Sequence, residues 1–468
     1  MILFGALLAV LFASAIVIWR LKERSLYILF LAAYTQNLVV PLLFTHGYIG
    51  KDAARALLLI KDFLLLELFL WSVAILYKRF RPPWPSPLKP LLVFTVYCLL
   101  RFSVGVLLLG ENMTEGLYKI KTMVFPLEIL VVVIVLAALK PEFGARFLRD
   151  IIYILSALAV VAIAILIFAP RDFWVENANV AVLQADVKGS ESEEALDFDK
   201  GISYSATMHG RELFAFMEAY RAVGTFGEAL ALSFSMAVPV LLLSFHFPKS
   251  FVSCLALTVV TAALFFSLTR SAWIFCAIVG SYVLIRRGWY RLFVFSAGLV
   301  VAFCLVFPPV AEFATTTIEN LSPANDNADS EHAEGLLWFY TRGFTDAGNI
   351  LGKGMNGEVQ TIPENGYAYV LEHFGAVAYL SFLWFCFSIY QQLGKSGTRP
   401  CVLALFGQGI AIAMLIVMHF SYYPFSLPTF MSLWYVVGLC LSSYLLPKNS
   451  LAPKTIPVKR RARQLRFA

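Results

Sequence analysis

The strongest constraint on this chain is the recurrence of apolar runs long enough to cross a lipid bilayer. A helix needs about 20 apolar residues to span the hydrocarbon core. Thirteen runs of roughly this length follow one another, at 2–19, 26–46, 56–77, 90–110, 122–139, 151–169, 228–247, 251–268, 272–287, 292–308, 366–390, 401–420 and 430–447. The chain is 60% hydrophobic and 14% charged, whereas a soluble domain carries about 25% charged residues. The sequence predicts an all-α, polytopic integral membrane protein with about 12–13 transmembrane helices, residues 1–468 forming a single transmembrane domain.

The loops between these runs sort by charge. One alternate set contains 23 of the 37 lysines and arginines and only three acids; it comprises 20–24, 77–89, 140–150, 246–250, 286–291, 391–400 and 448–468. Cytoplasmic loops of membrane proteins carry this excess of positive charge. We therefore expect an inner (plasma) membrane protein with its N-terminus outside. The basic tail 448–468 is then cytoplasmic, where it can contact anionic lipid.

Two long polar segments, 170–227 and 309–365, then fall outside as extracytoplasmic loops. The cytoplasmic loops are short and contain no nucleotide-binding glycine loop, so we expect any chemistry on the outer, periplasmic side. The basic residues that follow the first apolar run favour a membrane helix there over a cleaved signal peptide. The net charge of +7 reflects the loop bias, and no nucleic-acid partner is expected.

The cysteines and histidines give no sign of a disulfide framework or a metal site. All seven cysteines lie in or beside apolar segments, which is typical of small packing residues. The histidines have no paired or HExxH spacing. We expect no metal and no cofactor.

Charged residues lie well inside the predicted membrane helices 56–77, which has Lys61, Asp62 and Glu67, and 90–110, which has Arg101. An unpaired charge near the bilayer centre costs about 2.5–3.5 kcal/mol on insertion scales. Glu67 and Arg101 lie at similar depth in their helices, which predicts that they pair. Two interpretations stay open for such a pair: a buried ion pair that joins two helices, or a path for protons or substrate.

Two arginines flank a pair of apolar runs. Arg221 comes just before the run 228–247 and Arg270 just after the run 251–268. If both runs span, the two guanidinium groups reach the same face of the membrane. Guanidinium binds phosphate bidentately, so the pair predicts a phosphate clamp. The competing interpretation is that each arginine marks a helix end near lipid headgroups.

The residues around these arginines resemble the O-antigen ligase and O-antigen polymerase superfamily. The resemblance covers about 221–390 and rests on RAVGTF before one span, LTRSAW after the next, and ILGKGMNGEVQTIPENGYAYVLEHFGAVAYL later in the chain. Its order of motifs is similar to an Arg-x-x-Gly-Thr-Phe motif, a Ser-Arg type motif and a Gly-x-Gly turn before a His-Asn pair. The chain departs from that pattern at Glu364, where the family's ligases usually carry histidine.

The resemblance implies a membrane glycosyltransferase of surface or exported polysaccharide biosynthesis. Such enzymes transfer a glycan from a polyprenyl diphosphate carrier to an acceptor hydroxyl at the outer membrane face. The leaving diphosphate requires fixed cations, and the acceptor hydroxyl requires a base. The resemblance implies Arg221 and Arg270 as the cations and Glu364 as the base, with His373 and Glu372 as alternative bases.

The candidate catalytic residues are Arg221, Arg270, Glu364 and Asn365, and the candidate substrate-binding residues are Arg342, Lys353, Tyr367 and His373. The expected partners are the polyprenyl diphosphate-linked glycan donor, a glycan or lipid acceptor, membrane lipid and other polysaccharide assembly proteins. Glu364 in place of histidine favours a polymerase over a ligase. The alternative function is a polysaccharide flippase or exporter subunit, which the intramembrane charges favour; a structural scaffold ranks third.

Overall fold

The computed structural model describes most of the helical part of the chain. The described residues are 14–18, 20–80, 82–168, 211–214, 217–219, 222, 224–226, 229–247, 250–267, 269–296, 298, 338–346, 348–354, 365–395, 401–419, 421 and 427–445. Arg221, Glu364 and the basic tail 448–468 lie outside them. The predictions on those three features therefore stay predictions.

The described elements are predominantly helical, as the apolar runs predict. The long helices are α2 (Ser25–Thr45), α3 (Lys51–Arg79), α4 (Leu88–Leu108), α5 (Met113–Leu139), α6 (Pro141–Phe168), α10 (Ala229–Phe245), α11 (Phe251–Phe266), α12 (Arg270–Arg286), α17 (Gly366–Gly394), α18 (Val402–Val417) and α19 (Leu427–Ser442). Eleven of the thirteen apolar runs coincide with one of these helices. The other two, 2–19 and 292–308, lie largely outside the described residues.

Among the described residues, four helical segments are long and apolar enough to cross a membrane: Lys22–Thr45, Leu88–Leu108, Pro141–Phe168 and Gly366–Gly394. Shorter apolar helices accompany them, including most of α10, α11, α18 and α19. This content is compatible with a membrane protein, the class that the sequence predicts.

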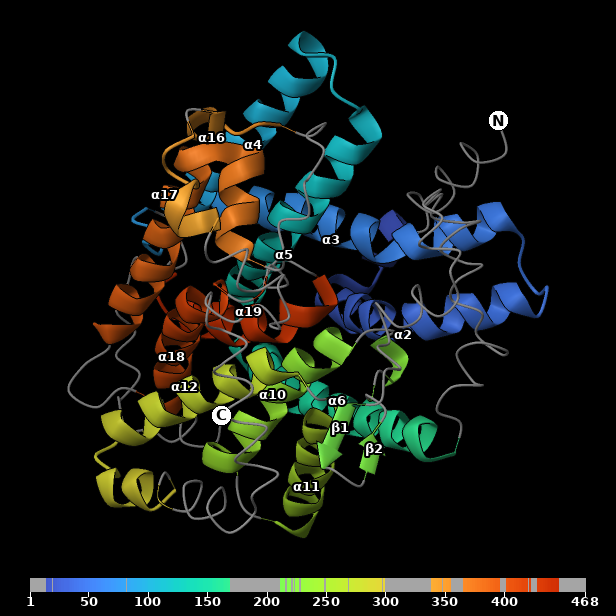
Figure 1. Ribbon diagram of the computed structural model, residues 1–468, viewed down its shortest axis with the longest axis vertical. Helices are drawn as coiled ribbons and strands as arrows, with labels where there is room; N and C mark the ends of the chain where they lie inside the picture. The colour runs from blue at the N-terminus through green and yellow to red at the C-terminus, as the bar shows by residue number, and fades with distance from the viewer. Residues whose placement is uncertain are drawn as a thin grey trace.

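The centre of the molecule is the contact between α5 and α19, which lies in the middle of the bundle (Figure 1). Residues 127–137 of α5 are all buried, whichever way their side chains point. All of them except Glu128 are apolar, and a helix that is apolar on nearly every side belongs in an interior. Gly438 of α19 lets the two backbones approach, because a Cβ there would lie 2.9 Å from the Cβ of Val133.

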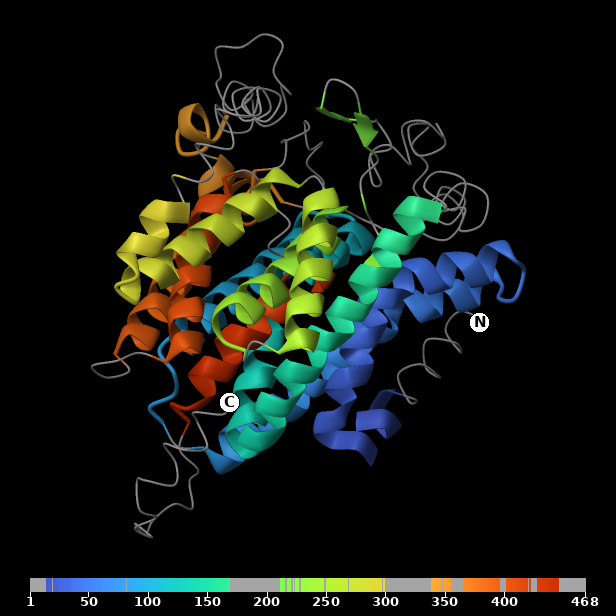
Figure 2. The same ribbon diagram turned by 90° about the horizontal axis from the view of Figure 1, so that it is seen from below.

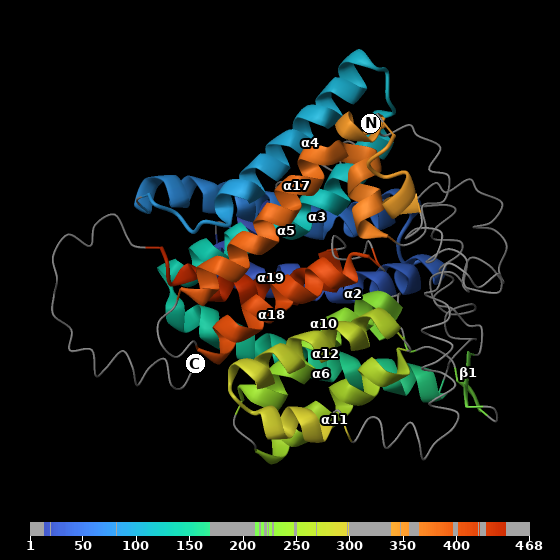
Figure 3. The same ribbon diagram turned by 60° about the vertical axis from the view of Figure 1, so that its left-hand side comes forward.

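The helix termini lie at two opposite ends of the bundle. At one end, Ala222 N–H donates to Phe266 O and Gly366 N–H donates to Met418 O, both at 2.8 Å. The short helix α16 (Gly348–Leu351) and the strands β1 (Arg211–Phe214) and β2 (Met217–Ala219) lie at this end (Figures 2 and 3). At the other end, Tyr444 Oη donates to Gln392 O at 2.8 Å.

Two features within the long polar segments bear on the sequence predictions. β1 and β2 form an antiparallel hairpin with an irregularity between Glu212 and Phe214; no strand was expected from the sequence. In the second polar segment, residues 338–341 are helical, where the apolar stretch GLLWFYTRGF predicts a short helix.

The predicted Glu67–Arg101 ion pair is wrong. Arg101 Nη2 lies 3.0 Å from Glu111 Oε1, and Glu67 accepts a hydrogen bond from Ser14 Oγ at 2.8 Å. The prediction compared only the depth of Glu67 and Arg101 along straight helices. It left out the turn after α4, where Gly110 has a φ of 67° and the chain folds back to bring Glu111 to Arg101. Asp62 pairs with Lys121 of α5 at 2.6 Å.

Candidate functional site

The candidate site forms where α17 is broken near its start. Gly375 has φ 84° and ψ 179°, which interrupts the helix. The backbone of Gly352 lies directly against this break: a Cβ on Gly352 would lie 2.6 Å from His373 O and 2.8 Å from Gly375 N. A Cβ on Gly375 would lie 2.6 Å from Ile350 O. Both positions therefore require glycine, because each backbone occupies the space of the other's side chain.

Next to the break, Lys353 N–H donates a hydrogen bond to Glu372 O at 2.6 Å. The segment 352–354 is thus attached to α17 along its backbone.

A buried ion pair holds the other side of this segment. Arg101 Nη2 donates to Glu111 Oε1 at 3.0 Å and to Gly352 O at 3.2 Å. The side chains of Arg101 and Glu111 are only 9% and 6% exposed. Gly105 of α4 and Gly354 flank the pair so closely that a Cβ at either position would overlap the Glu111 carboxylate. The pair therefore fits between two backbone surfaces that only glycine provides.

His373 is attached to the same segment. Its Nδ1 lies 3.0 Å from Gly354 O, and its side chain is almost completely buried. A carbonyl oxygen only accepts hydrogen bonds, so Nδ1 carries the hydrogen and, in the neutral ring, Nε2 keeps its lone pair. Nε2 is buried and makes no hydrogen bond in the described part of the chain. The ring packs edge to face on Tyr369, with centroids 4.5 Å apart.

Charged side chains surround His373. Lys119, buried in α5, is within electrostatic range of both His373 and Glu372. Lys353 Nζ lies 3.7 Å from Glu372 Oε1 and 2.9 Å from Asp346 Oδ2. In the loop, the hydrogen bond from Lys353 lowers the pKa of Asp346, and the same bond raises the pKa of Lys353. We call Arg101, Glu111, Lys119, Lys353, Glu372 and His373 the α17 cluster.

The α17 cluster contains two of the predicted substrate-binding residues, Lys353 and His373, and Glu372, an alternative base. Asn365 and Tyr367 have other contacts. Asn365 Oδ1 caps α17 by accepting from Tyr367 N–H and Ala368 N–H, both at 3.0 Å. Tyr367 Oη donates to Leu415 O at 2.7 Å, and its ring is buried.

The remaining predicted site residues lie elsewhere. Arg342 is exposed and follows the short helix at 338–341. Arg270 is the first residue of α12, and α12 packs mainly on α18 and α10, whereas the α17 cluster lies where α17 meets α4. Helix α18 packs against both α12 and α17. Arg221 and Glu364 lie outside the described residues.

Sequence reasoning missed Glu111 and Lys119 as members of the site. Both lie in the stretch between the predicted runs 90–110 and 122–139, where charged residues are typical of an ordinary polar connection. The sequence held one signal for Glu111. It directly follows Gly110 and lies ten residues after Arg101, and a tight turn at the glycine can bring two residues at this spacing together.

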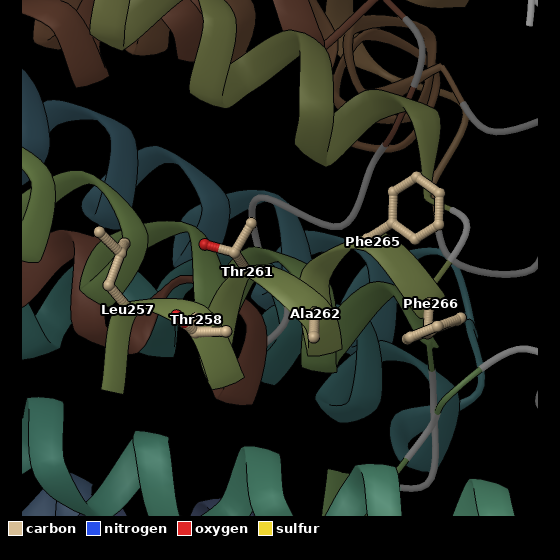
Figure 4. A pocket seen from close by; sticks show the side chains of 6 residues that line it. All are labelled: Leu257, Thr258, Thr261, Ala262, Phe265 and Phe266. Atoms are coloured by element: carbon tan, nitrogen blue, oxygen red, sulfur yellow. The ribbon is translucent and has the colours of Figure 1, made fainter. Parts of the chain in front are cut away.

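One hollow lies away from the α17 cluster. It runs along α11 and is lined by Leu257, Thr258, Thr261, Ala262, Phe265 and Phe266 (Figure 4). Its lining is mostly apolar and contains no charged side chain, so it offers none of the groups that acid–base or phosphate chemistry requires.

No family model, no curated protein and no solved structure matches this chain.

Proposed function

We propose that this chain is a membrane glycosyltransferase that transfers a glycan from a polyprenyl diphosphate carrier to an acceptor hydroxyl. It acts as a polymerase or an O-antigen-type ligase of surface or exported polysaccharide. In this proposal 12–13 helices cross an inner membrane, the segments 170–227 and 309–365 lie on its outer side, and the α17 cluster faces that side.

The observation that carries the proposal is the state of His373. Its Nδ1 hydrogen points to Gly354 O, and its Nε2 lone pair is buried without a hydrogen-bond partner among the described residues. A base in this state can take the proton of a sugar hydroxyl. The ammonium of Lys119 nearby provides the positive charge that an anionic leaving group needs.

The diphosphate site is the second part of the proposal. Arg270 opens α12, and Ala222, the residue after Arg221, is bonded to Phe266 at the end of α11. That bond brings the chain at position 222 to the end of α11, four residues before Arg270. A pair of arginines there suits a diphosphate, because guanidinium forms bidentate contacts with phosphate oxygens.

An exporter is less well supported, because two of the charges that favour it, Asp62 and Arg101, are paired in the structure. Asp62 is 2.6 Å from Lys121 and Arg101 is 3.0 Å from Glu111. Such pairs can hold neighbouring segments together without a transport role.

The test compares His373→Asn with Glu364→Gln in cells that lack the native gene. Asparagine can still donate to Gly354 O but has no nitrogen at the position of Nε2. The exposed histidine His46 provides the matched control, His46→Asn. Polysaccharide chain length is read on gels at equal protein levels. Transfer is measured in proteoliposomes with undecaprenyl diphosphate-linked oligosaccharide as the probe.

Loss of a general base lowers the rate by about 10²–10⁴-fold. We expect that loss for His373→Asn and wild-type transfer for His46→Asn. If Glu364→Gln alone abolishes transfer, Glu364 is the base. If neither substitution lowers transfer, the acid–base proposal is wrong. For the diphosphate site, Arg270→Ala should lower transfer by roughly 10- to 150-fold, the loss of one charge-assisted contact of about 1.5–3 kcal/mol.

A further inference from the structure

A chain of contacts links the turn after α4 to the ring of His373. Glu111 is paired with Arg101 at 3.0 Å, and Arg101 donates to Gly352 O at 3.2 Å. Gly354, two residues on, receives the His373 Nδ1–H bond of 3.0 Å. The Glu111 carboxylate also lies directly against Gly354, with no room for a Cβ between them.

The segment that holds His373 depends on these outside contacts. Gly352 and Gly354 both have positive φ, 83° and 93°. Glycine loses the most entropy on adopting one conformation, so two such residues do not fix the Gly354 carbonyl by themselves. The buried Arg101–Glu111 pair is suited to do so, because opening it would leave a charge buried without its partner.

We propose that Arg101 and Glu111 are positioning residues for His373, which fix the Gly354 carbonyl and through it the orientation of the imidazole. This inference rests on the proposed function. Neither residue touches the substrate. They keep Nδ1 of His373 as the hydrogen-bond donor and Nε2 as the acceptor. They also hold the imidazole ring in one position. A general base acts in the transition state, in which the proton is transferred. A misplaced base therefore lowers kcat more than it raises KM.

The first experiment inserts a methyl group without changing any charge. In Gly354→Ala the new Cβ overlaps Glu111 Oε1 and Arg101 Nη2, so it should force the pair away from the segment. Gly47→Ala is the matched control: Gly47 also has a positive φ, 72°, but no atom lies within 4 Å of the place its Cβ would take. Both substitutions carry the same kind of backbone strain, and only one disturbs the pair.

The readout is the rate at which diethyl pyrocarbonate modifies His373 in the full-length protein in detergent micelles, followed by mass spectrometry. The reagent attacks an accessible imidazole nitrogen, and the exposed His46 is the internal standard. We expect slow modification of His373, at the same rate in the wild-type protein and in Gly47→Ala, because its ring is held in place by Gly354 and Tyr369. In Gly354→Ala its modification should rise by about tenfold or more, as expected when a charge-assisted contact is lost.

Glu111→Gln is the second variant, and it is measured alongside in case Gly354→Ala does not accumulate. It keeps the size of the side chain and an accepting oxygen but removes the charge. We expect faster modification of His373 and a lower kcat with KM within about twofold. Unchanged protection of His373 in both variants overturns the inference. Chemical modification needs no transfer assay, so this result is independent of the proposed function, which fails separately if His373→Asn transfers normally.

Discussion

Gly375→Ala tests whether the break in α17 is fixed by its contact with Gly352. At φ 84° and ψ 179°, Gly375 occupies a region open almost only to glycine, where another residue costs about 1–3 kcal/mol. The added Cβ would also lie 2.6 Å from Ile350 O and 2.7 Å from Gly352 N. Overpacking of this kind costs a further ~1–3 kcal/mol. The free energy of unfolding should therefore fall by about 2–6 kcal/mol.

The matched control is Gly280→Ala in α12. The nearest atoms to a Cβ at that position are 3.9 and 4.0 Å away, which is ordinary contact. Alanine is favoured over glycine inside a helix by about 0.5–1 kcal/mol, so this variant should be as stable as the wild type or slightly more so.

Equilibrium unfolding in mixed micelles, with SDS as the denaturant, measures both variants on one scale. Buried Cys386 of α17 reports the same transition through its reactivity with a thiol reagent. If Gly375→Ala unfolds at the same SDS fraction as Gly280→Ala, the backbone contact does not hold the break, and the α17 cluster must be held together by other contacts.

Three further predictions use other parts of the structure. Asn365→Ala removes the cap of α17 and should cost about 0.5–2 kcal/mol in the same titration, with Asn365→Asp losing less because an accepting oxygen remains. The lowered pKa of Asp346 and the raised pKa of Lys353 come from their shared hydrogen bond. The Asp346 contribution to stability is present above the ordinary aspartate pKa and is lost as pH falls through the lowered value. The Lys353 contribution is present below the ordinary lysine pKa and is lost as pH rises through the raised value; Asp346→Asn should flatten both limbs of a stability-against-pH series. In a cysteine-free background, single cysteines at positions 200 and 455 should react with an impermeant thiol reagent from opposite sides of the membrane, and reaction from one side would end the proposed topology.

The apolar parts of the helices could be predicted from the sequence because hydropathy identifies them; their polar ends could not, since α5 begins at Met113, nine residues before its apolar run. Each of the eleven matching runs is a stretch of apolar residues that has to satisfy its backbone internally. Even the short run at 272–287 corresponds to α12. Such local signals do not depend on which helices are neighbours.

The candidate site could be predicted only in part, because its geometry depends on contacts between distant segments. The resemblance pointed to His373, Glu372 and Lys353. Their connection to Arg101 depends on a bond across 251 residues, and nothing local in the sequence specifies it. The partner of Arg101 was mispredicted because matching depth along two straight helices omits the turn that brings Glu111 back.

The Arg101–Glu111 pair also bears on the order in which the chain can be assembled. Its members are ten residues apart and belong to one helical hairpin, α4 and the turn before α5. The arginine can therefore be neutralised as soon as that hairpin has left the ribosome, and α4 can enter the bilayer without waiting for a distant partner. Gly352 is synthesised 251 residues later, and at about 5–20 residues per second the hairpin exists for many seconds before it. The Arg101–Glu111 pair can therefore form before the segment 352–354 and α17 are synthesised, and both can then pack against it.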